Sequence, residues 1–112
     1  MARYLISFDD GWMDFPREEL PVAAKAAHEV VVEAQNAGVW VFGGGLESQR
    51  ASIVATDGTV TDGPYPETKE VIGGFAVVDV PSRTEALEWA AKIAVACRCA
   101  QEVREFVPDP TV

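Results

Sequence analysis

The sequence predicts an α+β fold in which two helices pack on one face of an antiparallel sheet. Short stretches of alternating or continuous apolar residues, which are typical of strands, are interrupted twice by longer stretches with the period of an amphipathic helix. Their order is strand, helix, strand, strand, short strand, strand, helix, strand. That order matches a split β-α-β sheet, the ferredoxin-like arrangement.

The first half of the chain supplies one helix between two strands. An apolar stripe at helical spacing predicts the helix, Pro21 is tolerated near its start, and Gly38 is suited to end it. The strand after it opens into three glycines at 43–45, where we expect a bulge. The expected elements are a strand over residues 3–8, a helix over 18–37 and a strand over 39–42.

The second half supplies a hairpin, a long strand, a second helix and a last strand. Asp57-Gly58 has the chemistry of a tight hairpin turn, and Ser82 with Glu85 forms a capping box. We expect strands over residues 51–56, 59–61, 74–80 and 102–107, a helix over 82–97 and a polar loop over 62–70. No repeat or linker interrupts the chain, so residues 1–112 are expected to form a single domain.

Apolar residues occupy both faces of the predicted sheet. Tyr4 and Ile6 are opposed by Leu5, and Val78 is opposed by Val77. Two helices can cover only one face, and an antiparallel sheet with one face in water normally alternates apolar with polar residues. An uncovered apolar face would be a large exposed hydrophobic patch, which favours association with another surface. We therefore expect a homodimer through the open sheet face, since two-fold homodimers are the commonest oligomers.

Composition narrows the possible partners and the compartment. The net charge of −9, from 18 acidic and 9 basic residues, argues against binding to nucleic acid or to anionic membranes. No apolar run approaches the ~20 residues of a membrane span, and no signal peptide is expected. The only cysteines, Cys97 and Cys99, are interpreted as reduced thiols. The protein is therefore expected to be soluble and cytoplasmic.

The polar loop carries a resemblance to a known family. Residues 61–70 read T-D-G-P-Y-P-E-T-K-E and are followed by Gly73-Gly74-Phe75. This closely resembles the signature of the DGPF branch of the YCII-related family, and further similarity extends from Tyr4 to Val107. The resemblance implies a dimeric α+β barrel. It implies no assigned chemistry, although some relatives look like lyases or dehydrohalogenases of small aromatic rings and others have gene neighbours that suggest sigma-factor regulation.

The chain departs from the family pattern at two carboxylates. In the founding branch a His–Asp pair is the proposed catalytic element, and His28 lies about where that His belongs. Asn36 stands at the Asp position, and Gly44 replaces the glutamate of the family's G-E-G-L segment. An amide can orient an imidazole but cannot stabilise its positive form as a carboxylate does.

The candidate site combines the helix histidine with the polar loop. His28 is a candidate acid or base, with Asp62 as a second catalytic group. Substrate would be bound by Lys69, which suits an anionic group, and by Glu67, Tyr65 and Trp12, the last at the pocket mouth. The structural alternative is that Asp62 and its neighbours only hold a turn, and that His28 is an ordinary half-buried helix residue.

Two hypotheses of function stay open. The first is a cofactor-free enzyme, similar to a lyase or isomerase, that abstracts a proton from a small organic molecule. The second is a non-catalytic module that binds a ligand or regulates a partner, for example in sigma-factor regulation. No cofactor pattern is present, and one histidine with two neighbouring thiols does not make a zinc site.

Overall fold

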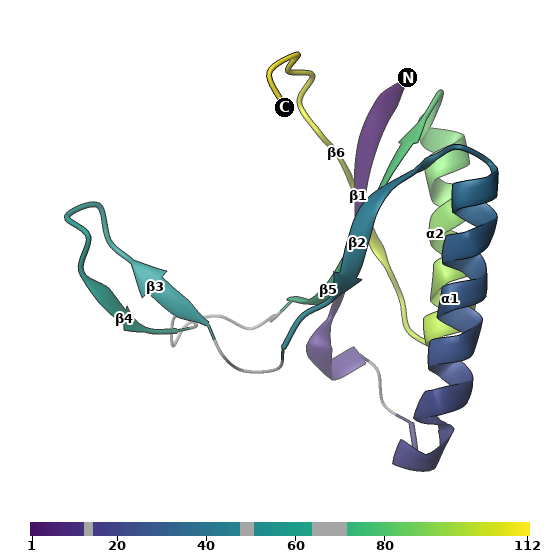
Figure 1. The fold of residues 1–112 in the computed structure, drawn as a ribbon, viewed down its shortest axis with the longest axis horizontal. Coiled ribbons are helices and arrows are strands. Elements are labelled where there is room, and N and C mark those ends of the chain that lie inside the picture. The colour runs from purple at the N-terminus through teal and green to yellow at the C-terminus, as the bar shows by residue number, and fades with distance from the viewer. Residues whose placement is uncertain (13–14, 48–50, 64–71) are drawn as a thin grey trace.

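The computed structural model describes residues 1–12, 15–47, 51–63 and 72–112. Two helices lie against one face of a sheet, and a separate hairpin projects on the other side (Figure 1). This confirms the predicted α+β, ferredoxin-like arrangement. The four strands of the main sheet form an open layer rather than a closed barrel within one chain.

The main sheet is antiparallel and has the strand order β2-β5-β1-β6. Its strands are β1 (Ala2–Asp9), β2 (Trp40–Gly45), β5 (Ile72–Val80) and β6 (Glu102–Glu105). The central pair, β1 and β5, is in register from Ala2 opposite Val80 to Phe8 opposite Gly74. Because β5 lies between β1 and β2, the connection through the first helix is the split crossover that the element order predicts.

Local signals set the limits of both helices, α1 (Leu20–Asn36) and α2 (Arg83–Cys97). Pro21 lies in the first turn of α1, and Gly38 follows its end with a φ of 74°. Ser82 caps α2, since its hydroxyl oxygen accepts a hydrogen bond from the Glu85 amide at 3.2 Å. Neither helix in the described part of the chain combines the length and the hydrophobicity of a membrane span.

Helix α1 packs mainly on α2 and contacts the sheet little. Ion pairs join the two helices near each end of α1: Arg98 with Glu19 at 2.8 Å, and Lys92 with Glu33. Both pairs are exposed, so each contributes little free energy and serves mainly to fix the relative position of the helices. This packing leaves space between α1 and the sheet.

The core lies between α2 and the helix-facing side of the sheet, here called the inner face. Tyr4 and Ile6 of β1 and Val78 of β5 are buried there against Ala86 and Ala90 of α2. The opposite side, here called the outer face, carries Leu5, Phe42, Phe75 and Val77. Strand alternation puts these residues on the side away from the helices.

The hairpin forms a second, two-stranded sheet that is separate from the first. It consists of β3 (Ser52–Val54) and β4 (Val60–Asp62), joined by the predicted Asp57-Gly58 turn. Gly58 has a φ of 90°, and an oxygen of the Asp57 carboxylate accepts a hydrogen bond from the Thr59 amide at 2.9 Å. That hydrogen bond lowers the pKa of Asp57, so the carboxylate is charged when it holds the turn.

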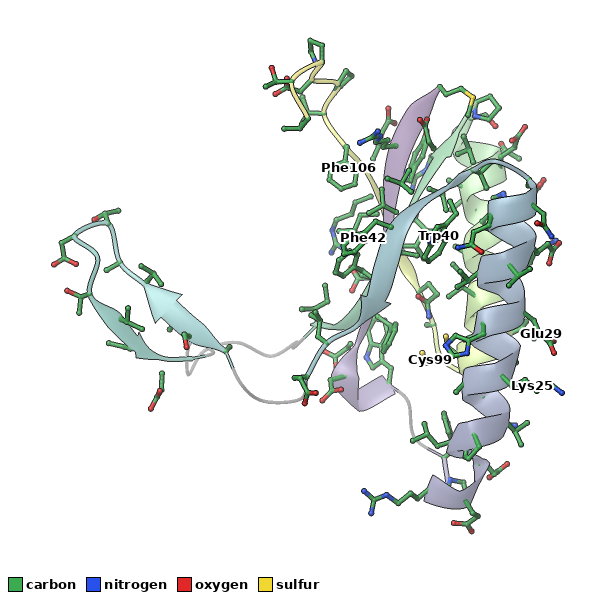
Figure 2. The ribbon with its side chains drawn as sticks, in the orientation of Figure 1. Lys25, Glu29, Trp40, Phe42, Cys99 and Phe106 are labelled. Atoms are coloured by element: carbon green, nitrogen blue, oxygen red, sulfur yellow. The ribbon has the colours of Figure 1, made fainter. Side chains whose placement is uncertain are left out.

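Strand β2 differs from its prediction in two ways. The glycines at 43–45 do not end the strand but pair with β5. A register shift between Trp40 and Phe42 puts Trp40 opposite Val78 and Phe42 opposite Val77. Simple alternation, which would place both aromatic rings on one face, is therefore wrong here: Trp40 points toward the helices and Phe42 away from them (Figure 2).

Candidate functional site

A cavity of about 330 Å³ lies between α1, α2 and the inner face of the sheet. Pockets that bind small molecules usually begin at about 300 Å³ and are mostly apolar. Most of the wall is apolar side chain. It includes Ile6, Phe8, Trp40 and Val78 from the sheet, Trp89 and Ile93 from α2, and Ala23, Ala27, Val30, Val31 and Ala34 from α1.

The cavity exists because α1 presents small side chains to the sheet. Ala23, Ala27 and Ala34 line the cavity at positions where a core helix commonly carries leucine or isoleucine. These small side chains, with Phe8 and Trp40 on the opposite wall, leave the space between the two layers unfilled. A well-packed interior rarely leaves voids much larger than a water molecule. The volume of this cavity is therefore unusual for a domain of 112 residues.

His28 is the imidazole of this site. It lies in the middle of α1, one residue after Ala27, and it lines both the cavity and a shallow surface depression over Pro21, Lys25 and Val32. The residue is exposed, so its ring is in contact with solvent at one edge of the cavity. His28 therefore lies where the wall of the cavity meets solvent.

The remaining polar groups come from the end of α2 and the segment before β6. Cys97 is the last residue of α2 and lines the cavity together with Gln101. The chain turns sharply between them because Arg98 adopts a left-handed conformation, with a φ of 59°. The Gln101 amide nitrogen donates to the carbonyl oxygen of Cys99 at 3.3 Å, which orients the amide at the cavity wall.

The two thiols are poor nucleophiles in this setting. Burial raises the pKa of Cys97, and burial with the nearby Cys97 raises the pKa of Cys99. The thiolate is the reactive form of cysteine, and a free thiol has a pKa of about 8.5. Both side chains are therefore neutral at pH 7, and Cys97 acts as part of the apolar wall rather than as a reactive group.

The described wall contains one group suited to proton transfer. Among the described residues that line the cavity, His28 and Cys97 have the only ionisable side chains, and none is a carboxylate. No group of three or more metal-ligating side chains occurs within residues 1–12, 15–47, 51–63 and 72–112. The arrangement can hold a mostly apolar molecule and present one imidazole to it.

The structure does not bring the two predicted catalytic residues together within one chain. Asp62 ends β4 in the projecting hairpin, whereas His28 lies on α1 across the sheet (Figure 1). Trp12 lies in a short 3-10 turn and is not among the residues that line the cavity. Tyr65, Glu67 and Lys69 lie outside the described residues. The substrate-binding role of that loop stays a prediction.

A family model described as the YCII-related domain matches residues 18–108. The chain belongs to the YCII-related domain family. No curated protein matches the chain with significance.

The structure shows where the two residues that depart from the family pattern, Asn36 and Gly44, lie in this YCII-related domain. Asn36 lies eight residues after His28 on α1, which corresponds to about 12 Å along the helix axis. Asn36 is exposed, so its amide does not orient the imidazole through a direct hydrogen bond at that separation. Gly44 pairs with Phe75 in the outer-face row, so a glutamate side chain there would leave the strand on the side away from the helices, although the main chain of Gly44 lines the cavity.

Sequence reasoning missed most of the cavity of this YCII-related domain. It singled out His28 but assigned no part of the cavity to Trp40, Trp89, Cys97 or Gln101. One signal was available: alanine recurs along the stripe of α1 that faces the core. A helix stripe of that kind fills little volume, and large side chains opposite it leave a cavity.

Proposed function

We propose that this YCII-related domain binds a small, mostly apolar molecule in the cavity between α1 and the inner face of the sheet. The observation that supports this best is the cavity itself, with about 330 Å³ of space behind an alanine-lined helix. A dry, engineered apolar cavity of about 150 Å³ is enough to bind benzene. The space here suits a ligand of two fused rings or similar size.

The apolar wall favours binding over elaborate chemistry. Aromatic rings from β1, β2 and α2 offer broad contact surfaces, and burial of apolar ligand area contributes about 25 cal/mol per Å². His28, Gln101 and the main chain of Gly45 supply the few polar atoms that orient a ligand. One hydroxyl or carbonyl on an otherwise apolar ligand matches this distribution.

Filling the cavity tests the proposal. Ala27→Leu adds three carbon atoms to a residue that lines the cavity, and Ala26→Leu makes the same change on the neighbouring residue, which lines only the surface groove between α1 and α2. We expect Ala27→Leu to weaken binding of naphthalene at least tenfold by isothermal titration calorimetry, because the added side chain occupies the ligand's space. Ala26→Leu should bind as the wild type does.

Two results would contradict the proposal. One is a wild-type protein that takes up neither naphthalene nor 2-indanone at their solubility limits. The other is an equal loss of binding in Ala26→Leu and Ala27→Leu, which would mean that the probe binds somewhere other than the cavity. Thermal unfolding of both variants shows whether either has lost its fold.

A second candidate function is proton transfer to or from the bound molecule. The specific observation is the His28 imidazole in the wall of a largely apolar cavity. A neutral imidazole can accept a proton from a carbon acid and return it at another position. The cysteines do not compete for this role, because their raised pKa values keep them neutral.

Exchange of a carbon-bound proton measures this activity without knowledge of the natural substrate. We expect the wild type to speed deuterium exchange at the acidic C–H groups of 2-indanone in D₂O, followed by NMR. His28→Gln should lose about 100-fold of that rate, the lower end of what a positioned general base provides. Glu29→Gln, at an exposed position beside His28, is the control. Equal rates in wild type and His28→Gln would leave a binding function only.

We also propose that a second copy covers the outer face and that the protein works in a reducing compartment such as the cytoplasm. Phe42 is 62% exposed and Phe106 is 45% exposed, and both lie on the side away from the helices (Figure 2). Covering such rings in a dimer lowers the free energy, because it removes exposed apolar surface from water. The free thiols of Cys97 and Cys99 support the reducing compartment.

A further inference from the structure

The β3–β4 hairpin, with its base at residues 51 and 63, is here called the hairpin arm. Its base is closed by a hydrogen bond from the Gly63 amide to the Ala51 carbonyl at 2.8 Å. Val54 and Val60 lie directly opposite each other on one side of the arm, 66% and 63% exposed. An isolated two-stranded hairpin is at best marginally stable in water, so an arm of this kind is expected to rest on another surface.

The arm projects on the same side of the sheet as the outer face (Figure 1). From Ala51 to Asp57 the chain takes six residue steps, which span about 20 Å when extended. Two sheets packed face to face lie about 10 Å apart. If two copies pack through their outer faces, each arm is about twice as long as the gap and has to run along the body of the other copy.

Charge favours the same contact. The arm contains Asp57 and Asp62 and no lysine or arginine in residues 51–63. The outer side of the sheet carries Arg3 of β1, with Asp79 opposite it, and Arg104 of β6, which is ion-paired with Glu102. These charges balance, so in a chain with a net charge of −9 this part of the outer face repels the aspartates of the arm less than an average acidic surface does.

We propose that the hairpin arm is a clasp that holds a second copy of this chain. Each arm lies along the outer-face side of its partner, with Val54 and Val60 packed against it and the two aspartates toward the partner's arginine-bearing strands. The clasp rests on the outer-face dimer proposed above and adds an element to it. It explains why an exposed valine pair sits at a distance from the domain's own core.

Two neighbouring residues on β4 provide a matched test. Val60 and Thr61 are both exposed and point to opposite sides of the arm. We expect Val60→Lys to raise the dimer dissociation constant about tenfold or more, because the change removes buried apolar area and adds a cation next to Arg3 and Arg104. Thr61→Lys should change it by less than about threefold. Sedimentation equilibrium over a dilution series of the full chain gives both constants.

The possible results distinguish the clasp proposal from the proposal of an outer-face dimer. A wild type that stays monomeric up to high micromolar concentration overturns both proposals. A dimer with the same dissociation constant in wild type, Val60→Lys and Val54→Lys overturns the clasp and leaves the outer-face dimer intact. Weakening by Val60→Lys and not by Thr61→Lys supports the clasp, and circular dichroism of each variant confirms that the fold is retained.

Discussion

At the scale of single residues, two adjacent glycines in β2 have opposite constraints. A Cβ atom on Gly43 would lie 2.5 Å from the Phe75 carbonyl oxygen and 2.8 Å from the Ala76 Cα. These are main-chain atoms that cannot move aside without breaking the pairing of β2 with β5. A Cβ atom on Gly44 would meet nothing within 4 Å. The first glycine is required by close approach, and the second is not.

This contrast predicts different effects of the same substitution. We expect Gly43→Ala to lower the free energy of unfolding by about 2 kcal/mol or more, since overpacking in a tight interior typically costs 1–3 kcal/mol. Gly44→Ala should be neutral or stabilising by up to about 1 kcal/mol, because alanine loses less conformational freedom than glycine in a strand. Urea denaturation of both variants measures the difference. Similar losses in the two would show that β2 does not pack as described.

At the scale of elements, local signals were enough to find nearly every helix and strand. Ser82 and Glu85 predicted the start of α2, Gly38 the end of α1, and Asp57-Gly58 the hairpin, and each has the expected local geometry. These features depend on residues a few positions apart, so they can be read without the fold. The positions of the aromatic side chains on β2 could not, because Trp40 and Phe42 are equally apolar and alternation does not reveal a register shift.

The candidate site was predictable only in part, because it depends on packing between residues that are far apart in the sequence. The sequence singled out His28 as the candidate acid or base, and His28 lines the cavity. The cavity itself depends on the space between Ala23 and Ala27 and the aromatic rings of the sheet. That space is set by packing between residues that are far apart in the sequence. Local turn chemistry likewise predicted the hairpin that contains Asp62 but not its direction, which carries Asp62 away from α1.

At the scale of the whole molecule, the sheet separates the two surfaces to which we assign functions. Its inner face borders the cavity, and its outer face carries the exposed rings of Phe42 and Phe106. The helix layer has exposed apolar residues as well, among them Val95 of α2. Exposure alone does not select the surface that a second copy covers. What distinguishes the outer face is that its aromatic residues adjoin one another, with the Phe42 and Phe75 rings 5.6 Å apart.

If a second copy covers the outer face, a charge introduced on that face raises the dimer dissociation constant, whereas the same charge on the helix layer does not. We expect Phe42→Lys to raise the dimer dissociation constant more than tenfold, because the change removes a large apolar contact and buries a cation. Val95→Lys introduces the same charge on the helix layer and should leave the constant unchanged. Light scattering on dilution measures both. Equal weakening by the two substitutions, or weakening by Val95→Lys alone, would move the interface to the helices.

The register shift in β2 decides which face Phe42 occupies. If Val41 paired with Val77 in a regular strand, every later residue of β2 would turn to the opposite face. Phe42 would then take the place of Gly43 opposite Ala76, beside the Trp40 ring, where even a methyl group is too close. A β2 strand without the shift would both fill the proposed ligand space with a benzyl group and remove an exposed aromatic ring from the proposed dimer surface.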